Sequence, residues 1–198
     1  MNGGVPGADS DGFAVPRQIL SLLNGFDRPW WVAGGWAVDL FVRRLTRLHK
    51  DIEIALFRHD QSALQEHLAG WSLRKVVDHR RVSWLPGEWL TLPVHEIHGR
   101  GPEGQALEIL LNEYDRGRWV FRRDSAITRP AKLIYARSAE GVPFLRPEIV
   151  LLYKSRGAGP DDHADFEQAV GLLDHESRTW LGAAVRRHVP GHRWLHDL

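Results

Sequence analysis

The first third of the chain changes its hydrophobic period several times. Pro16 and the apolar residues after it predict a helix that ends near Asn24, because they form one apolar face. The apolar run 30–33 predicts a short buried strand, and the apolar spacing of residues 36–44 predicts a helix. Residues 51–57 alternate strictly, so we expect a strand with its acidic side chains on one face.

Short strands separated by glycine and proline dominate the middle of the chain, and helices follow them. After a helix expected over residues 61–68, the pattern predicts strands over residues 73–77, 81–84, 94–98, 106–111, 133–135 and 142–145. Beyond Arg146 the pattern predicts helices over residues 148–156, 162–173 and 176–188. Together these elements predict an α+β core of mixed strands with a C-terminal helical segment.

Three segments are expected along the 198 residues of the chain. Residues 1–12 are rich in glycine and acidic, so we expect a flexible leader; they lack the apolar core of a signal peptide. Residues 13–146 are expected to form the core. Residues 147–198 are expected to form a helical region packed on it. A chain of this length can bury a stable core without a metal or a disulfide.

Composition and charge exclude several classes of protein. The chain has no cysteine, which excludes a disulfide scaffold, a thiol nucleophile and a cysteine-ligated metal site. No apolar run approaches 18 residues, so we expect a cytoplasmic protein without a membrane partner. The 26 basic and 25 acidic residues nearly balance, so charge gives no reason to expect nucleic acid as a partner.

Two acidic residues on one predicted strand are the first candidate for chemistry. Asp51 and Glu53 are two positions apart, so their carboxylates are expected to project from one face of the strand. Such carboxylates repel each other unless a cation lies between them, and Mg²⁺ prefers oxygen ligands of this kind, often completed by phosphates. Taken alone, the pair fits a solvated strand face better than a metal site.

A glycine pair upstream favours the metal site over the solvated strand face. Gly34 and Gly35 follow a predicted strand and precede a predicted helix, where free backbone N–H groups suit an anion. Glycine also lets phosphate oxygens approach the backbone closely. A Gly-Gly pair alone indicates only a tight turn. Combined with the acid pair, it predicts a site that binds a triphosphate on one side and a metal on the other.

The stretch 31–56, WVAGGWAVDLFVRRLTRLHKDIEIAL, resembles the nucleotidyltransferase superfamily related to DNA polymerase β. Its motifs GGWAVD and TRLHKDIEI are similar to those of the aminoglycoside 2″-nucleotidyltransferases and the lincosamide nucleotidyltransferases. The resemblance implies a nucleotidyltransferase-like mixed β-sheet flanked by helices. It also implies that Gly34 and Gly35 contact the triphosphate, and that Asp51 and Glu53 bind Mg²⁺, with two ions expected.

The resemblance further implies a third carboxylate on a neighbouring strand. Glu108 is the best candidate, because its apolar neighbours indicate a buried strand, where an unpaired acid is costly. Glu96 and Glu113 are the competing candidates. Glu108 is expected to serve as a metal ligand, as the base that takes the hydroxyl proton, or as neither.

Four more residues are candidates for binding the nucleotide. Arg47 and His49 fit the family pattern just before the acid pair, and Trp36 follows the glycines. Lys154 lies on the helix expected after residue 147 and resembles a lysine in the C-terminal part of related proteins. For each, a purely structural role is the alternative.

By this resemblance the protein transfers a nucleotidyl group, expected to be AMP from ATP, to a hydroxyl of a small molecule. Its partners are then the nucleotide and an acceptor, with an aminoglycoside-like antibiotic as the leading candidate and antibiotic resistance as the consequence. A monomer or a homodimer is expected. Two alternatives remain: transfer to RNA or protein, which predicts a continuous arginine patch from residues 74–81 and 116–129, and a catalytically silent nucleotide-binding module.

Overall fold

The computed structural model describes residues 12–198, so the predicted leader lies outside the described residues apart from Gly12. The strands are β1 (Trp30–Val32), β2 (Glu53–Phe57), β3 (Ser72–Val77), β4 (Arg80–Ser83), β5 (Glu96–Arg100), β6 (Ala106–Asp115), β7 (Arg118–Val120), β8 (Thr128–Pro130), β9 (Tyr135–Arg137) and β10 (Pro143–Leu145). The α-helices are α1 (Ala14–Leu22), α2 (Gly34–Val42), α3 (Gln61–His67), α4 (Pro147–Lys154), α5 (Pro160–Val170) and α6 (His175–His188). The short 3₁₀ helices are η1 (Arg58–Asp60), η2 (Ala131–Leu133) and η3 (Arg193–His196).

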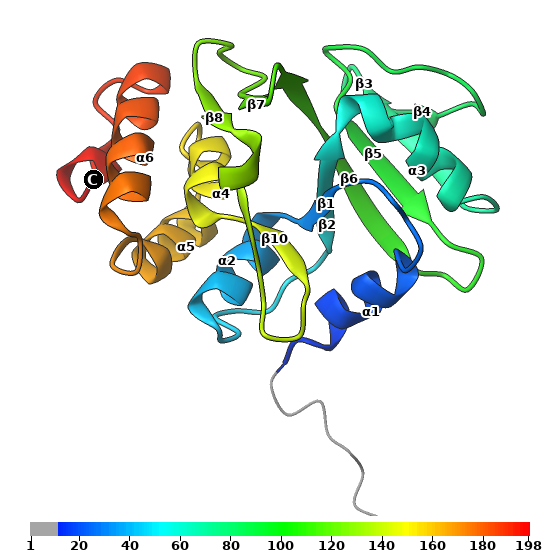
Figure 1. Ribbon diagram of the computed structural model, residues 1–198, viewed down its shortest axis with the longest axis horizontal. Helices are drawn as coiled ribbons and strands as arrows, with labels where there is room; N and C mark the ends of the chain where they lie inside the picture. The colour runs from blue at the N-terminus through cyan, green and yellow to red at the C-terminus, as the bar shows by residue number, and fades with distance from the viewer. Residues whose placement is uncertain (1–11) are drawn as a thin grey trace, which may run out of the picture.

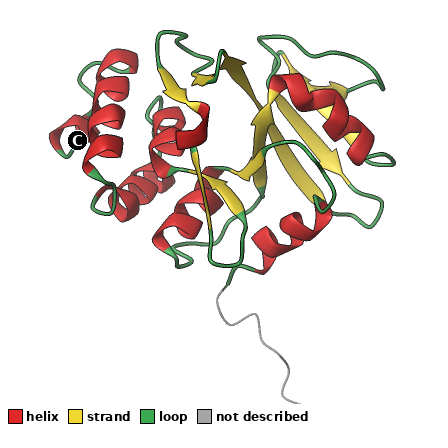
Figure 2. Ribbon diagram, in the orientation of Figure 1, coloured by secondary structure: helices red, strands yellow, loops and turns green. Residues whose placement is uncertain are grey.

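One mixed β-sheet organises these elements, which confirms the predicted fold class. Its strands follow the order β4-β3-β5-β6-β2-β1-β10-β9, and β7 and β8 extend it from β6. The pairs β2–β6 and β1–β10 are parallel, whereas the other neighbours are antiparallel. Helices flank the strands (Figure 2). None of the helices between residues 12 and 198 has the length and apolar character needed to cross a bilayer.

The register of the central strands separates a polar face from an apolar one. Glu53 on β2 lies opposite Glu108 on β6, and Ile54 lies opposite Ile109. His98 on β5 lies opposite Glu108 from the other side. Residues paired across strands share a face, and successive residues alternate between faces. The two isoleucines are fully buried in the apolar core, so the glutamates and His98 occupy the opposite face.

The C-terminal helices form a separate layer beside one part of the sheet. Helix α4 packs against α2, α5 and α6, and Figure 1 shows these helices on the side away from β3, β4 and β5. Pro147 and Pro160 begin α4 and α5, where the missing N–H of proline has no cost. The Asp174 side chain accepts a hydrogen bond from the Ser177 N–H and so caps α6. This layer places the end of α4 near the start of α2.

Several predicted elements are wrong in their details. The strand expected over residues 133–135 is absent: the chain forms η2 there, and β9 begins only at Tyr135. Strand β2 begins at Glu53, so Asp51 precedes it; the Asp51 carbonyl accepts from the Trp36 indole N–H at 3.1 Å. The predicted turn at Gly34 is instead the first turn of α2.

Strands β7 and β8 were not expected from the sequence. Each is three residues long and carries an arginine, so neither shows a period of two in its apolar residues. Trp119 of β7 is fully buried and its indole N–H donates to Asn112 at 2.9 Å. Tertiary packing of that one side chain overrides the polar local pattern.

Candidate active site

Glu53 and Glu108 bring two negative charges together at the centre of the sheet. They lie opposite each other on the parallel strands β2 and β6. Burial raises the pKa of Glu53, and the charge of Glu108 raises it further. Lys154 lowers this pKa, whereas Asp51 and Glu96 raise it. The structure therefore brings the predicted acids close enough to destabilise one another's ionised forms.

Glu108 has a histidine partner that the sequence reasoning missed. His98 Nδ1 lies 3.1 Å from Glu108 Oε1, and His98 Nε2 lies 2.7 Å from Glu96 Oε1. Burial raises the pKa of Glu108, while His98 lowers it and Asp51 raises it. Glu96 thus joins the site through His98. The third candidate, Glu113, pairs instead with Arg58 at 2.6 Å.

The donor set of this site fits Mg²⁺. Asp51, Glu53 and Glu108 offer carboxylate oxygens, which this hard cation prefers, and the raised pKa values of the two glutamates reflect burial and crowded negative charge. Residues 12–198 contain no group of three or more His, Cys, Asp or Glu side chains already placed to hold a metal ion. The carboxylates are therefore neighbours that are not gathered into one coordination shell, and their metal role stays a prediction.

The glycine pair makes room for side chains of the same protein. Gly34 has φ +60°, and a Cβ atom there would overlap the carboxylate of Glu53. At Gly35 a Cβ atom would meet the side chains of Arg47 and His49. Glycine is thus needed at both positions to seat candidate site residues against the start of α2. Contact of these glycines with a triphosphate stays a prediction.

A buried aspartate fixes the loop before the acid pair. Asp39 on α2 is fully buried, and its Oδ2 lies 2.6 Å from His49 Nε2. The Thr46 hydroxyl donates to the other carboxylate oxygen. The Trp36 ring lies 4.5 Å from that of His49. The signal in the sequence is an acid inside the apolar helix WAVDLFV, because a buried acid requires partners.

The two predicted phosphate-binding cations meet at a second buried aspartate. Arg47 Nε lies 3.2 Å from Asp165 Oδ1, and Lys154 Nζ lies 3.0 Å from Asp165 Oδ2. Lys154 also pairs with Asp162 at 2.6 Å. Burial lowers the pKa of Lys154, but the hydrogen bond with Asp162 and the charge of Asp165 outweigh it and raise the pKa. Both cations are therefore anchored to α5.

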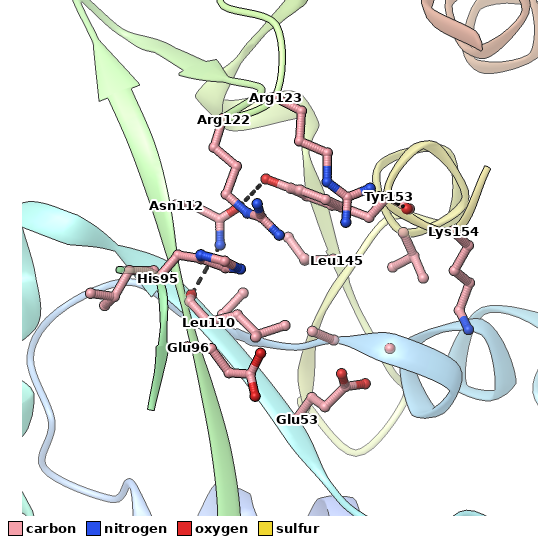
Figure 3. Close-up of a pocket in the computed structure, with 15 residues that line it drawn as sticks. Glu53, His95, Glu96, Leu110, Asn112, Arg122, Arg123, Leu145, Tyr153 and Lys154 are labelled. Carbon is pink, nitrogen blue, oxygen red and sulfur yellow. Dashed lines mark hydrogen bonds between the residues drawn. The ribbon is translucent and has the colours of Figure 1, made fainter. Parts of the chain in front are cut away.

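A pocket of about 260 Å³ lies between Glu53 and the C-terminal helices. Glu53 and Glu96 project from the sheet on one side of it, and Arg122, Arg123 and Tyr153 lie across from them (Figure 3). Burial raises the pKa of Tyr153 to about 12, so its hydroxyl stays protonated near neutral pH. That hydroxyl donates to Asn112 Oδ1 at 3.3 Å.

A second hollow lies on the other side of the carboxylates. Its volume is about 320 Å³, and Asp51, Glu108 and His98 line it together with Arg74 and Arg81. The candidate acids therefore border two hollows, with Glu53 and Glu96 at the first and Asp51 and Glu108 at the second.

One arginine of the patch expected for an RNA or protein acceptor lies inside the protein. Arg129 is 2% exposed and pairs with Glu148 at 3.1 Å, inside the protein. Arg74 lies at the second hollow and Arg122 at the first. Arg129 is therefore not part of an exposed arginine patch.

Comparison with known proteins finds relatives of the part of the chain that forms most of the sheet. The family model described as aminoglycoside-2″-adenylyltransferase matches residues 16–137. A 2″-aminoglycoside nucleotidyltransferase from Klebsiella pneumoniae is 34% identical over 65 residues, which cover 31% of this chain and 37% of that relative. One from Escherichia coli is 32% identical over 65 residues, with the same coverage. The match thus spans little more than a third of the length of these curated relatives.

Solved structures show the same fold. The antibiotic-resistance enzyme ANT(2″)-Ia in complex with adenylyl-2″-tobramycin has a TM-score of 0.58 at 16% identity, covering 87% of this chain and 96% of that chain. The lincosamide antibiotic adenylyltransferase LnuA, solved with lincomycin, has a TM-score of 0.54 at 20% identity, covering 77% of this chain and 92% of that one. Because the family model matches more than half of the sequence, this chain belongs to the aminoglycoside-2″-adenylyltransferase family.

Proposed function

We propose that this protein is a Mg²⁺-dependent nucleotidyltransferase that moves AMP from ATP to a hydroxyl of a small molecule and releases pyrophosphate. One observation carries the proposal: Glu53 and Glu108 face each other across parallel strands, and the Glu53 carboxylate lies against Gly34 at the start of α2. The family to which the chain belongs supports it. A cluster of partly buried acids with raised pKa values is typical of functional sites.

The relatives suggest which acceptors to test first. The curated relatives are named for aminoglycosides, and LnuA was solved with lincomycin, a lincosamide. We infer an acceptor of comparable size and an antibiotic-resistance role. We also infer action in the cytoplasm, as a monomer or a homodimer, with residues 13–146 as the catalytic core and residues 147–198 as the helical region packed on it.

In this mechanism Glu108 takes the proton of the acceptor hydroxyl. The acceptor oxygen then bonds to the α-phosphorus, the bond from that phosphorus to the bridging oxygen breaks, and pyrophosphate leaves with the electron pair. The raised pKa of Glu108 suits a base, because such a carboxylate binds a proton more tightly. His98 holds this carboxylate toward the second hollow.

Asp51 and Glu53, with Glu108, are the residues that would hold Mg²⁺, which supplies positive charge to stabilise the phosphates as charge develops on them. Lys154 lines the first pocket beside Glu53, so it adds a positive charge on the side of the departing pyrophosphate. Trp36, Arg47 and His49 would act by holding the loop and α2 in place around the nucleotide. Much of the catalysis is then positioning and electrostatics.

The test is release of pyrophosphate by the purified full chain with each of the four NTPs, Mg²⁺ and a panel of aminoglycosides and lincosamides. We expect release that depends on one nucleotide, on an acceptor and on Mg²⁺, with the acceptor gaining one AMP by mass spectrometry. Nucleotide binding without transfer to any acceptor would favour the silent module. Transfer to RNA or protein, but to no small molecule, would replace the acceptor class.

A further inference from the structure

Two arginines beside the first pocket differ in their surroundings from the buried arginines of the protein. Arg122 is half-buried and Arg123 lies next to it at the rim, and both line the pocket. Their guanidinium carbons lie 5.3 and 5.5 Å from the centre of the Tyr153 ring. Burial lowers the pKa of each, and the charge of Arg122 lowers that of Arg123 further. Two like charges are thus held together on one aromatic ring.

Neither guanidinium is neutralised by a carboxylate within ion-pair distance among residues 12–198. Arg123 Nη1 donates to the Tyr153 carbonyl at 2.8 Å, which leaves other N–H groups of the pair for a ligand. The contrast is with Arg129, which is buried and paired with Glu148. The charges of Glu96 and Glu113 favour the charged form of Arg122, but neither acid forms an ion pair with it. A bound anion would therefore stabilise these two partly desolvated cations.

Hydrogen bonds and ring contacts hold the Tyr153 side chain on which these arginines lie. Tyr153 donates to Asn112, and Asn112 is 3% exposed and also accepts from the Trp119 indole at 2.9 Å. The Trp119 and Tyr153 rings meet edge to face at 6.0 Å. Tyr153 is therefore a positioning residue that fixes the plane on which the arginines lie. A guanidinium group held in one plane can donate two parallel hydrogen bonds to two oxygens of one phosphate group.

We propose that Arg122 and Arg123 form an anion-binding site for a phosphate group in this pocket, opposite Glu53 and beside Lys154. The proposal rests on the proposed function, which supplies two sources of that group. It belongs either to the triphosphate of the nucleotide or to an anionic acceptor. In both cases the pair repels a polycationic group from this wall of the pocket, so it also restricts which acceptors fit.

The test is calorimetric titration of inorganic pyrophosphate, without Mg²⁺, into the full chain and its variants. We expect R122Q/R123Q to weaken pyrophosphate binding by about tenfold or more, since charge-assisted hydrogen bonds are lost. R122K/R123K keeps the charge and is expected to lose less. The matched control R116Q/R118Q removes two arginines from the hairpin outside the pocket and is expected to bind as the wild type does. Thermal melts exclude unfolding.

A parallel titration of ATP identifies which molecule carries the phosphate group that this site binds. If ATP affinity falls in step with pyrophosphate affinity, the site holds the nucleotide triphosphate; if only pyrophosphate affinity falls, it holds an anionic acceptor. Equal pyrophosphate affinity in wild type and R122Q/R123Q, or no binding to wild type, overturns the proposal. E53Q separates the two proposals, because it is expected to abolish transfer and to keep metal-free pyrophosphate binding.

Discussion

Two glutamates, the partly buried Glu53 and the fully buried Glu148, have the same side chain and opposite surroundings. Glu148 on α4 is fully buried; Arg129 Nη2 and Arg146 Nε each lie 3.1 Å from its Oε1, and the Ser177 hydroxyl donates to it. Burial raises the pKa of Glu148, and both arginines oppose this. At Glu53 burial has the same effect, but Glu108 adds to it.

The difference separates a structural acid from a candidate catalytic one. Around Glu148 the cations belong to the fold and tie α4 to β8 and α6. Around Glu53 the neighbouring acids make the folded state bear unfavourable charge that a bound cation relieves. Burial alone therefore does not distinguish the candidate active site from a structural ion pair; the sign of the charges around each acid does.

The largest expected effect is on activity at Glu53. E53Q keeps the shape of the side chain but removes the charge that would hold Mg²⁺, which is worth several kcal/mol of transition-state stabilisation. We expect kcat/KM for nucleotidyl transfer to fall about a thousandfold, with no loss of thermal stability, because a repulsive charge has gone. Pyrophosphate release and a melting curve measure both. A variant that keeps a tenth of wild-type activity would contradict the assignment.

The next effect is on stability at Glu148. E148Q leaves Arg129 buried without its carboxylate, and breaking a buried ion pair in this way costs about 3 kcal/mol. We expect urea unfolding to show that loss, while activity per folded molecule stays near that of the wild type. Equal destabilisation by E53Q would remove the distinction between the two glutamates.

Gly34 tests how closely Glu53 depends on the backbone. G34A combines a left-handed φ with overlap of the new Cβ and the Glu53 carboxylate, so we expect a loss of about 2 kcal/mol together with lower activity. The control is G25A, since Gly25 also has a positive φ, +84°, but no atom within 4 Å of the added Cβ. A similar loss in both variants would assign the effect to backbone strain alone.

The sequence predicts the parts of the site that are local in the chain. The acid pair, the glycines that begin α2 and the mixed sheet follow from patterns a few residues long. The parallel pairing of Glu53 with Glu108 agrees with the third carboxylate expected from the resemblance. The missed partners are distant. Asp165 lies 118 residues from Arg47, and nothing in either local pattern indicates that they pair.

Another class of error comes from packing that overrides a local pattern. The strands β7 and β8 are three residues long and each carries an arginine, so their local pattern does not predict a strand. Burial of Trp119 in the core favours the pairing of β7 with its neighbours. His98 has an unremarkable strand context, and its role emerges only from the register that sets it opposite Glu108. Long-range register and tertiary burial are the quantities that short patterns do not contain.

The smallest expected effect is stabilisation of the folded state by Mg²⁺, which distinguishes Glu53 from Glu148. A cation that binds only the folded state stabilises it by about 1.4 kcal/mol at ten times its Kd, which for a chain of this size is a rise in Tm of about 3–5 °C. We expect this rise with Mg²⁺ for the wild type and for E148Q, and its reversal by EDTA. E53Q is expected to show none of it, because the site has lost a ligand and the repulsion that the cation relieves. If E53Q responds to Mg²⁺ as the wild type does, the cation binds elsewhere, and the crowded charge at Glu53 needs another explanation.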